Sequence, residues 1–232
     1  MANWFLDRAL AEEAEAENAP WSFLGEGVTF WVTVAVLLVV GVAVYLVTRK
    51  KSSKKSFWTA KTMAVGAMCM ALSSVLSLIK LWPMPMGGSV TPASMLPLLL
   101  FAYCYGVGPG MVLGALYGVM QFLLDGMAWA ALGAIPNLLD YPIAFGLLGL
   151  AGCFRGSKAK MTAGFVLGCF GRFMASFLSG FIFYGQYAPD GVNPVWYSLT
   201  YNGSYMLVEC LICIALGLLV GERLAKELKK VA

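Results

Sequence analysis

Apolar residues form seven long segments along the chain, and the stretches between them hold most of the charged, glycine and proline residues. A helix needs about 20 apolar residues to cross the hydrocarbon core of a bilayer, so this pattern predicts an all-α integral membrane protein. The third segment is short and meets the fourth at a Gly-Val-Gly-Pro turn. The segments are residues 28–48, 57–79, 95–105, 110–124, 138–153, 161–184 and 198–220.

Lysine and arginine residues gather in three places, at 49–55, 155–160 and 223–230. A chain that alternates through seven spans brings all three clusters to the same membrane face. Because cytoplasmic loops are enriched in lysine and arginine, that face is predicted to be cytoplasmic. The acidic N-terminal tail, 1–27, is then extracellular and the C-terminus cytoplasmic.

The first segment, 28–48, differs from the others because it has neither a glycine-rich packing face nor a polar insertion. A basic cytoplasmic linker, 49–56, follows it. We therefore expect an extra N-terminal transmembrane helix, serving as an anchor or a partner-docking helix, ahead of a six-helix core. That core is expected to cover residues 57–223, and a basic cytoplasmic tail, 224–232, follows it.

The composition supports a membrane protein and excludes several other classes. Hydrophobic residues make up 60% of the chain and charged residues 12%, whereas soluble domains are near a quarter charged. The net charge of +4 is not gathered on a basic face, so no nucleic acid partner is expected. There is no histidine, and the six cysteines fall in or beside apolar segments, which predicts packing residues and no metal or other cofactor.

Small residues recur at helical spacing in several segments. Glycines four residues apart, as at Gly110, Gly114 and Gly118, predict close helix packing inside the bundle. In the second segment a comparable face is built from alanines. It has two equally good interpretations, packing within the bundle or docking against another membrane protein. Its residues are Ala60, Ala64, Ala67 and Ala71.

Ionisable residues inside spans are costly and are therefore candidates for functional roles. Arg172 and Glu209 could form a structural ion pair at depth or serve a function. Asp140 is placed near the outer end of its span, where a carboxylate surrounded by aromatic rings would suit a cationic or amine-bearing ring. The alternative for Asp140 is an acid favoured by the dipole at a helix N-terminus.

Aromatic residues are unusually dense in the outer segment 183–205, where they alternate with glycine, proline, asparagine and aspartate. Single rings there fit an interfacial aromatic belt. Their clustering instead predicts a shaped cap, and the outer loop 83–92 could cover it. We expect a small-molecule site at the extracellular side, lined by rings with few polar anchors.

In these segments the sequence resembles a known family, the thiamine-specific substrate-binding (S) components of energy-coupling factor (ECF) transporters. The resemblance extends from about residue 57 to the C-terminus. It is carried by the motifs at 86–91 and 95–97, 138–142 and 144–146, 179–180 and 187–189, and 196–198 and 201–203.

The resemblance implies a six-helix protein that holds thiamine near the outer face. It implies an acid at Asp140 beside Tyr141, a ring at Tyr184 that stacks on the ligand, and hydrogen-bonding groups at Tyr197 and Asn202. The motif at 86–91 adds Gly88 and Ser89 to the expected site, and the family alignment adds Ser176. The resemblance also implies the cell membrane of a prokaryote. Some members carry Glu, Trp and His at the positions of Asp140, Tyr184 and Ser176.

The resemblance also implies partners. Members bind a transmembrane coupling subunit and two ATP-binding subunits, and they dock through an alanine-rich face at the position of Ala60, Ala64, Ala67 and Ala71. A phosphate-binding G-x-x-x-x-G-K-[ST] loop does not occur in this chain, so ATP hydrolysis is expected in the partners and the chain is not expected to be an enzyme. Alternative functions are an S-component for a thiamine precursor or another B vitamin, and a non-catalytic membrane scaffold subunit.

Overall fold

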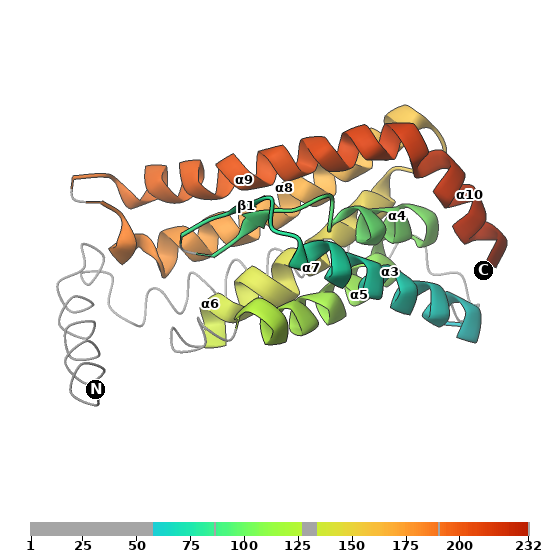
Figure 1. Cartoon of the computed structure of the whole chain (residues 1–232), viewed down its shortest axis with the longest axis horizontal. Helices are drawn as coiled ribbons and strands as arrows, with labels where there is room; N and C mark the ends of the chain where they lie inside the picture. The colour runs from blue at the N-terminus through green and yellow to red at the C-terminus, as the bar shows by residue number, and fades with distance from the viewer. Residues whose placement is uncertain (1–57, 86, 127–133, 190, 232) are drawn as a thin grey trace.

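The computed structural model describes residues 58–85, 87–126, 134–189 and 191–231, and most of these residues are helical. Among them, five helical stretches are long and apolar enough to cross a membrane (Figure 1). The predicted all-α membrane fold is therefore confirmed. The tail, first span and linker predicted at 1–27, 28–48 and 49–56 lie outside the described residues.

The first described helix, α3 (Ala60–Leu78), begins at a capping box. Thr59 accepts a hydrogen bond from the backbone N–H of Thr62, and the Thr62 hydroxyl accepts one from the backbone N–H of Thr59. These bonds satisfy backbone donors that a helix start leaves unpaired. One face of α3 packs on the bundle, and the opposite face is exposed.

The centre of the bundle is α4 (Leu96–Tyr105), in which every residue from Leu96 to Cys104 is buried. A helix that is apolar on all sides is expected in such a position. Its 10 residues span about 15 Å, roughly half of a bilayer core, so the short segment predicted at 95–105 does not cross alone. The chain turns at Gly106, whose φ of 105° favours glycine, into α5 (Val107–Gln121).

The predicted glycine stripe of α5 faces another helical run. That run passes without a break through α6 (Ala134–Leu138), the π-helical turn η4 (Leu139–Ile143), α7 (Ala144–Leu147) and the 3-10 turn η5 (Leu148–Cys153). Cβ atoms on the stripe would collide with the backbone of the run, so the prediction of close packing inside the bundle is confirmed.

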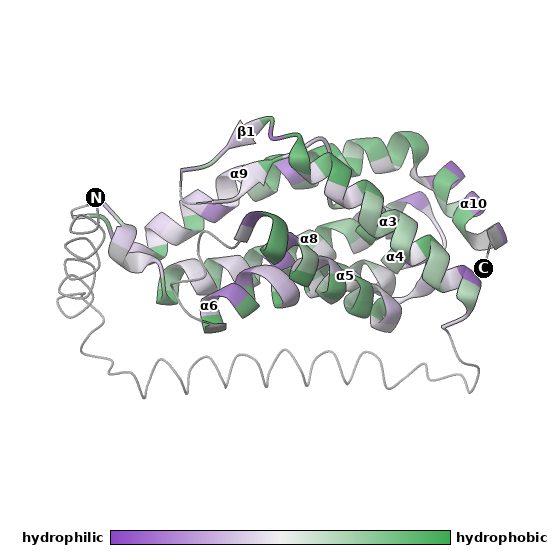
Figure 2. Cartoon of the chain, turned by 60° about the horizontal axis from the view of Figure 1, so that its bottom comes forward, coloured by the Kyte–Doolittle hydropathy of each residue, from purple (hydrophilic) through white to green (hydrophobic). Residues whose placement is uncertain are grey.

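Two long helices, α8 (Lys158–Ile182) and α9 (Pro194–Leu216), lie antiparallel and side by side (Figure 1). A 3-10 turn, η6 (Gly185–Tyr187), follows α8. After a π-helical turn, η7 (Gly217–Gly221), the chain bends into α10 (Glu222–Val231), which packs on α4 and α3. Figure 2 shows hydrophobic residues along much of the bundle and hydrophilic residues on α10.

Between α3 and α4 the chain forms a small antiparallel hairpin of β1 (Trp82–Pro83) and β2 (Ser89–Val90). Its register pairs Trp82 with Val90. Gly87 and Gly88 make its turn with φ values of 85° and 77°, which favour glycine. β2 lies against α9, so the hairpin packs over one side of the bundle.

Candidate ligand-binding cavity

A cavity lies in the part of the bundle remote from the basic start of α8. Segments far apart in the sequence line it, including the hairpin turn, α5, η4, α8 and α9. The 25 residues of α8 span about 37 Å from Lys158 to Ile182, and the cavity residue Tyr184 follows the far end of the helix. The structure brings together all eight residues predicted as the ligand site: Gly88, Ser89, Asp140, Tyr141, Ser176, Tyr184, Tyr197 and Asn202.

Asp140 is presented to the cavity by the π-helical turn η4 and is partly buried. Helical residues precede it, so its carboxylate is not at the start of a helix and the helix-dipole explanation does not apply. The Ser179 hydroxyl donates to Asp140 Oδ2 at 2.7 Å, and the hydroxyls of Ser176 and Tyr184 lie near the carboxylate. Ser179 thus holds the acid in the cavity wall, with two further hydroxyls beside it.

Tyrosines form the wall around the carboxylate. The rings of Tyr184 and Tyr187 lie 6.3 Å apart, those of Tyr197 and Tyr201 5.7 Å, and those of Tyr201 and Tyr205 6.2 Å at a steep angle. Tyr184 follows the end of α8, where burial raises the pKa of its hydroxyl above the ordinary value, so the group is a neutral donor. The wall therefore offers π-faces and hydroxyls without added charge.

The hairpin turn closes one side of the cavity. Tyr201 donates a hydrogen bond to the carbonyl oxygen of Gly87 at 2.9 Å, which ties the turn to α9. A Cβ at Gly88 would lie 2.8 Å from the Tyr205 ring, so only glycine fits this contact without a shift. Gly88 and Ser89 thus line the cavity through their place in the turn.

Asn202 is buried and already hydrogen-bonded within α9. Its amide nitrogen lies 3.1 Å from the Ser198 carbonyl oxygen, and its side-chain oxygen accepts from the Tyr205 hydroxyl at 3.1 Å. Gly180 on α8 makes room for this group, because a Cβ there would lie 2.9 Å from the Asn202 amide nitrogen. The amide is therefore held in one orientation at the cavity surface.

The sequence reasoning missed a polar cluster between α3 and α5. Gln121 is buried, and its side-chain oxygen lies 3.2 Å from the Ser77 hydroxyl and 3.1 Å from the Tyr117 hydroxyl. All three residues line the cavity. An amide near the end of an apolar span is a signal that could have identified Gln121. The serine and tyrosine are common in any helix and give no such signal.

Arg172 and Glu209 also line the cavity, and the structure pairs them. Arg172 Nη1 lies 4.0 Å from Glu209 Oε2, with 12% and 1% of the two side chains exposed. The guanidinium also stands 4.2 Å from the centre of the Phe145 ring. The ion pair suggested by the sequence is therefore present, and it forms part of the cavity.

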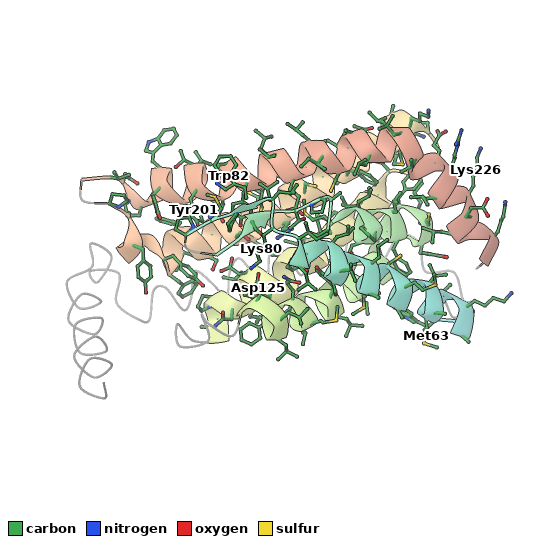
Figure 3. The ribbon with its side chains drawn as sticks, in the orientation of Figure 1. Met63, Lys80, Trp82, Asp125, Tyr201 and Lys226 are labelled. Carbon is green, nitrogen blue, oxygen red and sulfur yellow. The ribbon has the colours of Figure 1, made fainter. Side chains whose placement is uncertain are left out.

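A second ion pair lies at the cavity rim. Lys80, which follows α3, donates to Asp125 at 2.7 Å, and about two-fifths of each side chain is exposed (Figure 3). Asp125 follows α5 in the π-helical turn η2 (Phe122–Gly126). Exposed pairs of this kind contribute about 0–1 kcal/mol, so this one adds little to stability.

The alanine face predicted on the second segment lies on the exposed side of α3. All four alanines are exposed, and larger apolar neighbours such as Met68 and Leu72 are 71% and 53% exposed. Met63 on the same helix is also exposed (Figure 3). Among the described residues, nothing packs on this face at Ala60, Ala64, Ala67 and Ala71, which favours the docking interpretation.

Known proteins resemble both the sequence and the fold. The sequence model of the family described as thiamine transporter protein matches residues 63–228. The chain belongs to this family. The thiamine transporter ThiT of Bacillus subtilis is 38% identical over 56% of this chain and 73% of its own length. The ThiT of Lacticaseibacillus paracasei is 31% identical over 66% of this chain and 81% of its own.

A solved structure of ThiT from Listeria monocytogenes has the same fold, with a TM-score of 0.63 over 72% of this chain and 96% of that one. Its sequence identity is 21%, so this likeness concerns the fold. Family membership makes the chain a multi-pass membrane transport protein and not an enzyme. Within the described ranges, no group of acidic, cysteine or histidine side chains is placed to hold a metal ion.

Proposed function

We propose that the chain binds thiamine at the extracellular side of the membrane and delivers it inward as the substrate-specific subunit of an ATP-driven ECF importer. The main observation behind this proposal is the lining of the cavity, in which the Asp140 carboxylate lies among tyrosine rings. Thiamine offers the matching groups, an aminopyrimidine that can donate to a carboxylate and a cationic thiazolium ring. Two relatives named as thiamine transporters support the same ligand.

Each contact has a physical reason. A carboxylate that accepts from an amine forms a charge-assisted hydrogen bond, which is stronger than a neutral one. A cationic ring gains from lying over the π-face of Tyr184. Tyr197 and Asn202 then fix the orientation of the ligand with directional hydrogen bonds. Gly88 and Ser89 bring the hairpin turn close to it, and Tyr141 and Ser176 complete the wall beside Asp140.

The distribution of basic residues indicates on which side of the membrane the cavity lies. The start of α8 with Lys158 and Lys160, and α10 with Arg223 and Lys226, carry basic residues remote from the cavity. The positive-inside rule assigns this basic end to the cytoplasm, which leaves the cavity on the outer side with the N-terminus outside and the C-terminus inside. Lys226 projects at the α10 end of the bundle in Figure 3.

Delivery requires energy from partners. The exposed alanine face of α3 is a flat, apolar surface on which a helix of a transmembrane coupling subunit can pack closely. We propose that this subunit and two ATP-binding subunits complete the importer.

The first experiment is a titration of the purified full-length protein with thiamine, followed by tryptophan and tyrosine fluorescence. Saturable quenching with thiamine, absent with riboflavin and biotin, is the expected result. Asp140→Asn should weaken binding at least about tenfold, because hydrogen bonds to charged groups contribute about 1.5–3 kcal/mol. The matched control is Glu227→Gln, which makes the same change in an exposed pair with Lys230 and should bind normally.

Two outcomes would contradict the proposal. A response to a pyrimidine precursor or another B vitamin, without one to thiamine, would refute the ligand and keep the transporter class. Unchanged affinity of Asp140→Asn would refute the role of the carboxylate.

A further inference from the structure

A buried carboxylate lies deeper in the cavity than its tyrosine wall. Glu209, on α9, is 1% exposed, and its Oε1 atom accepts hydrogen bonds from the hydroxyl of Thr91 at 2.5 Å and from that of Ser94 at 2.8 Å. All three residues line the cavity. A buried acid that keeps its charge must be paired and hydrogen-bonded, and these hydroxyls supply part of that environment.

The two hydroxyls belong to a tightly constrained segment that follows β2. Ala93 has a φ of 69°, which a residue with a side chain rarely adopts. The backbone N–H of Ser94 donates to the Thr91 hydroxyl at 3.0 Å, and this hydroxyl in turn donates to Glu209. The carboxylate therefore fixes the base of the hairpin whose turn, with Gly88, lines the cavity.

The remaining oxygen of Glu209 faces Arg172 at 4.0 Å. The Nε and Nη1 atoms of Arg172 are buried and have no hydrogen-bond partner among the described residues, and the guanidinium lies over the ring of Phe145. Thus the positive charge of Arg172 is balanced within the cavity mainly by Glu209. Without Glu209 a cation would remain in the wall that is proposed to receive a cationic ligand.

The cavity contains three charged side chains away from its rim, Asp140, Arg172 and Glu209, and their charges leave one net negative charge. We propose that Glu209 is a positioning residue that selects for cationic ligands. It neutralises Arg172, so that the charge of Asp140 stays available to the ligand. This inference rests on the proposed function, because it takes the thiazolium ring as the cation.

The test compares two ligands of nearly the same shape, thiamine and its neutral 3-deaza analogue, in which carbon replaces the charged ring nitrogen. Glu209→Gln keeps an oxygen that can accept from Thr91 and Ser94 but removes the charge. We expect thiamine affinity to fall about tenfold more than affinity for the analogue. In general, unit charges roughly 10 Å apart at an effective dielectric constant near 20 interact with an energy that corresponds to a change of this size.

Equal losses for the two ligands would overturn the inference, since a purely structural role weakens both by one factor. The control is Thr91→Val with Ser94→Ala, which removes the hydrogen bonds and keeps the charge. It should leave the ratio of the two affinities at the wild-type value, and a ratio that shifts as in Glu209→Gln would also overturn the inference.

Glu209→Gln leaves Arg172 unpaired and can destabilise the fold. The second variant, Arg172→Met with Glu209→Gln, removes both charges and restores the net negative charge of the cavity. Its affinity ratio should match that of the wild type, and a ratio shifted toward the neutral analogue would refute charge selection. Wild-type protein that binds neither ligand would instead refute the proposed function, so the two failures are distinguishable.

Discussion

Gly118 provides a direct test of how helix packing supports the cavity. It lies on α5 where that helix crosses the π-helical turn η4. A Cβ at Gly118 would lie 2.6 Å from the carbonyl carbon of Tyr141 and 2.7 Å from the Cα of Pro142, and closer still to the carbonyl oxygen of Tyr141. All of these are backbone atoms, so Gly118→Ala must move α5 or the turn that holds Asp140.

The loss of stability in Gly118→Ala can be estimated from two opposing contributions, overpacking and helix propensity. Overpacking in a close-packed core costs about 1–3 kcal/mol, and rigid backbone contacts favour the upper part of this range. Alanine recovers about 1 kcal/mol through its better helix propensity. The net loss is about 2 kcal/mol, which in a protein of this size lowers the unfolding temperature by about 4–8 °C.

The assay is thermal unfolding of the purified protein in detergent, followed by tryptophan fluorescence, with a thiamine titration of each variant. The matched control is Gly203→Ala on α9, where the nearest atom to a new Cβ is Phe173 Cε2 at 3.8 Å, an ordinary contact. That variant should unfold at the wild-type temperature or slightly above it. If Gly118→Ala were as stable and bound thiamine as well as Gly203→Ala, the packing argument would be refuted.

Three further predictions concern other parts of the chain. Gly88→Ala, at a φ of 77° and against the Tyr205 ring, should weaken thiamine binding and lower the unfolding temperature; unchanged affinity would show that the turn does not shape the cavity. Ala64→Leu should leave binding intact but reduce thiamine uptake by cells about five- to 100-fold, because overpacking of an interface has a cost of this size. The control, Val112→Leu on the exposed side of α5, should leave uptake unchanged. Removing residues 1–56 should preserve binding in detergent, and lost binding would place the first predicted span in the site.

The helical fold could be predicted from the sequence because apolar segments and small-residue stripes depend on local spacing alone. The length of α4 illustrates the limit. Its sequence is as apolar as a span, but Gly106 ends the helix after 10 residues and the neighbouring helices bury it on all sides. An apolar sequence predicts that a segment is buried, but it does not tell whether lipid or protein surrounds that segment.

The resemblance to a family suggested the candidate site residues. All eight line one cavity, although they come from the hairpin, η4, α8, the turn after α8 and α9, and their binding role stays a prediction. The residues that were missed, such as Thr91 and Ser77, act through partners more than 40 residues away. Their chemistry is unremarkable in isolation, and only the packing of distant segments gives them a role.

The core around α4 and the cavity are stabilised in different ways, and this difference suits a binding protein. Around α4 and η5 the helices meet through glycines and apolar side chains, as at Gly110 and Gly149, which leave no space between backbones. Around the cavity the same helices are joined by hydroxyls, rings and the buried pair of Arg172 with Glu209. Polar contacts can exchange one partner for a ligand, whereas interlocked backbones cannot. The polar contacts around the cavity are therefore the ones that a ligand can replace, while the glycine contacts hold the helices in register.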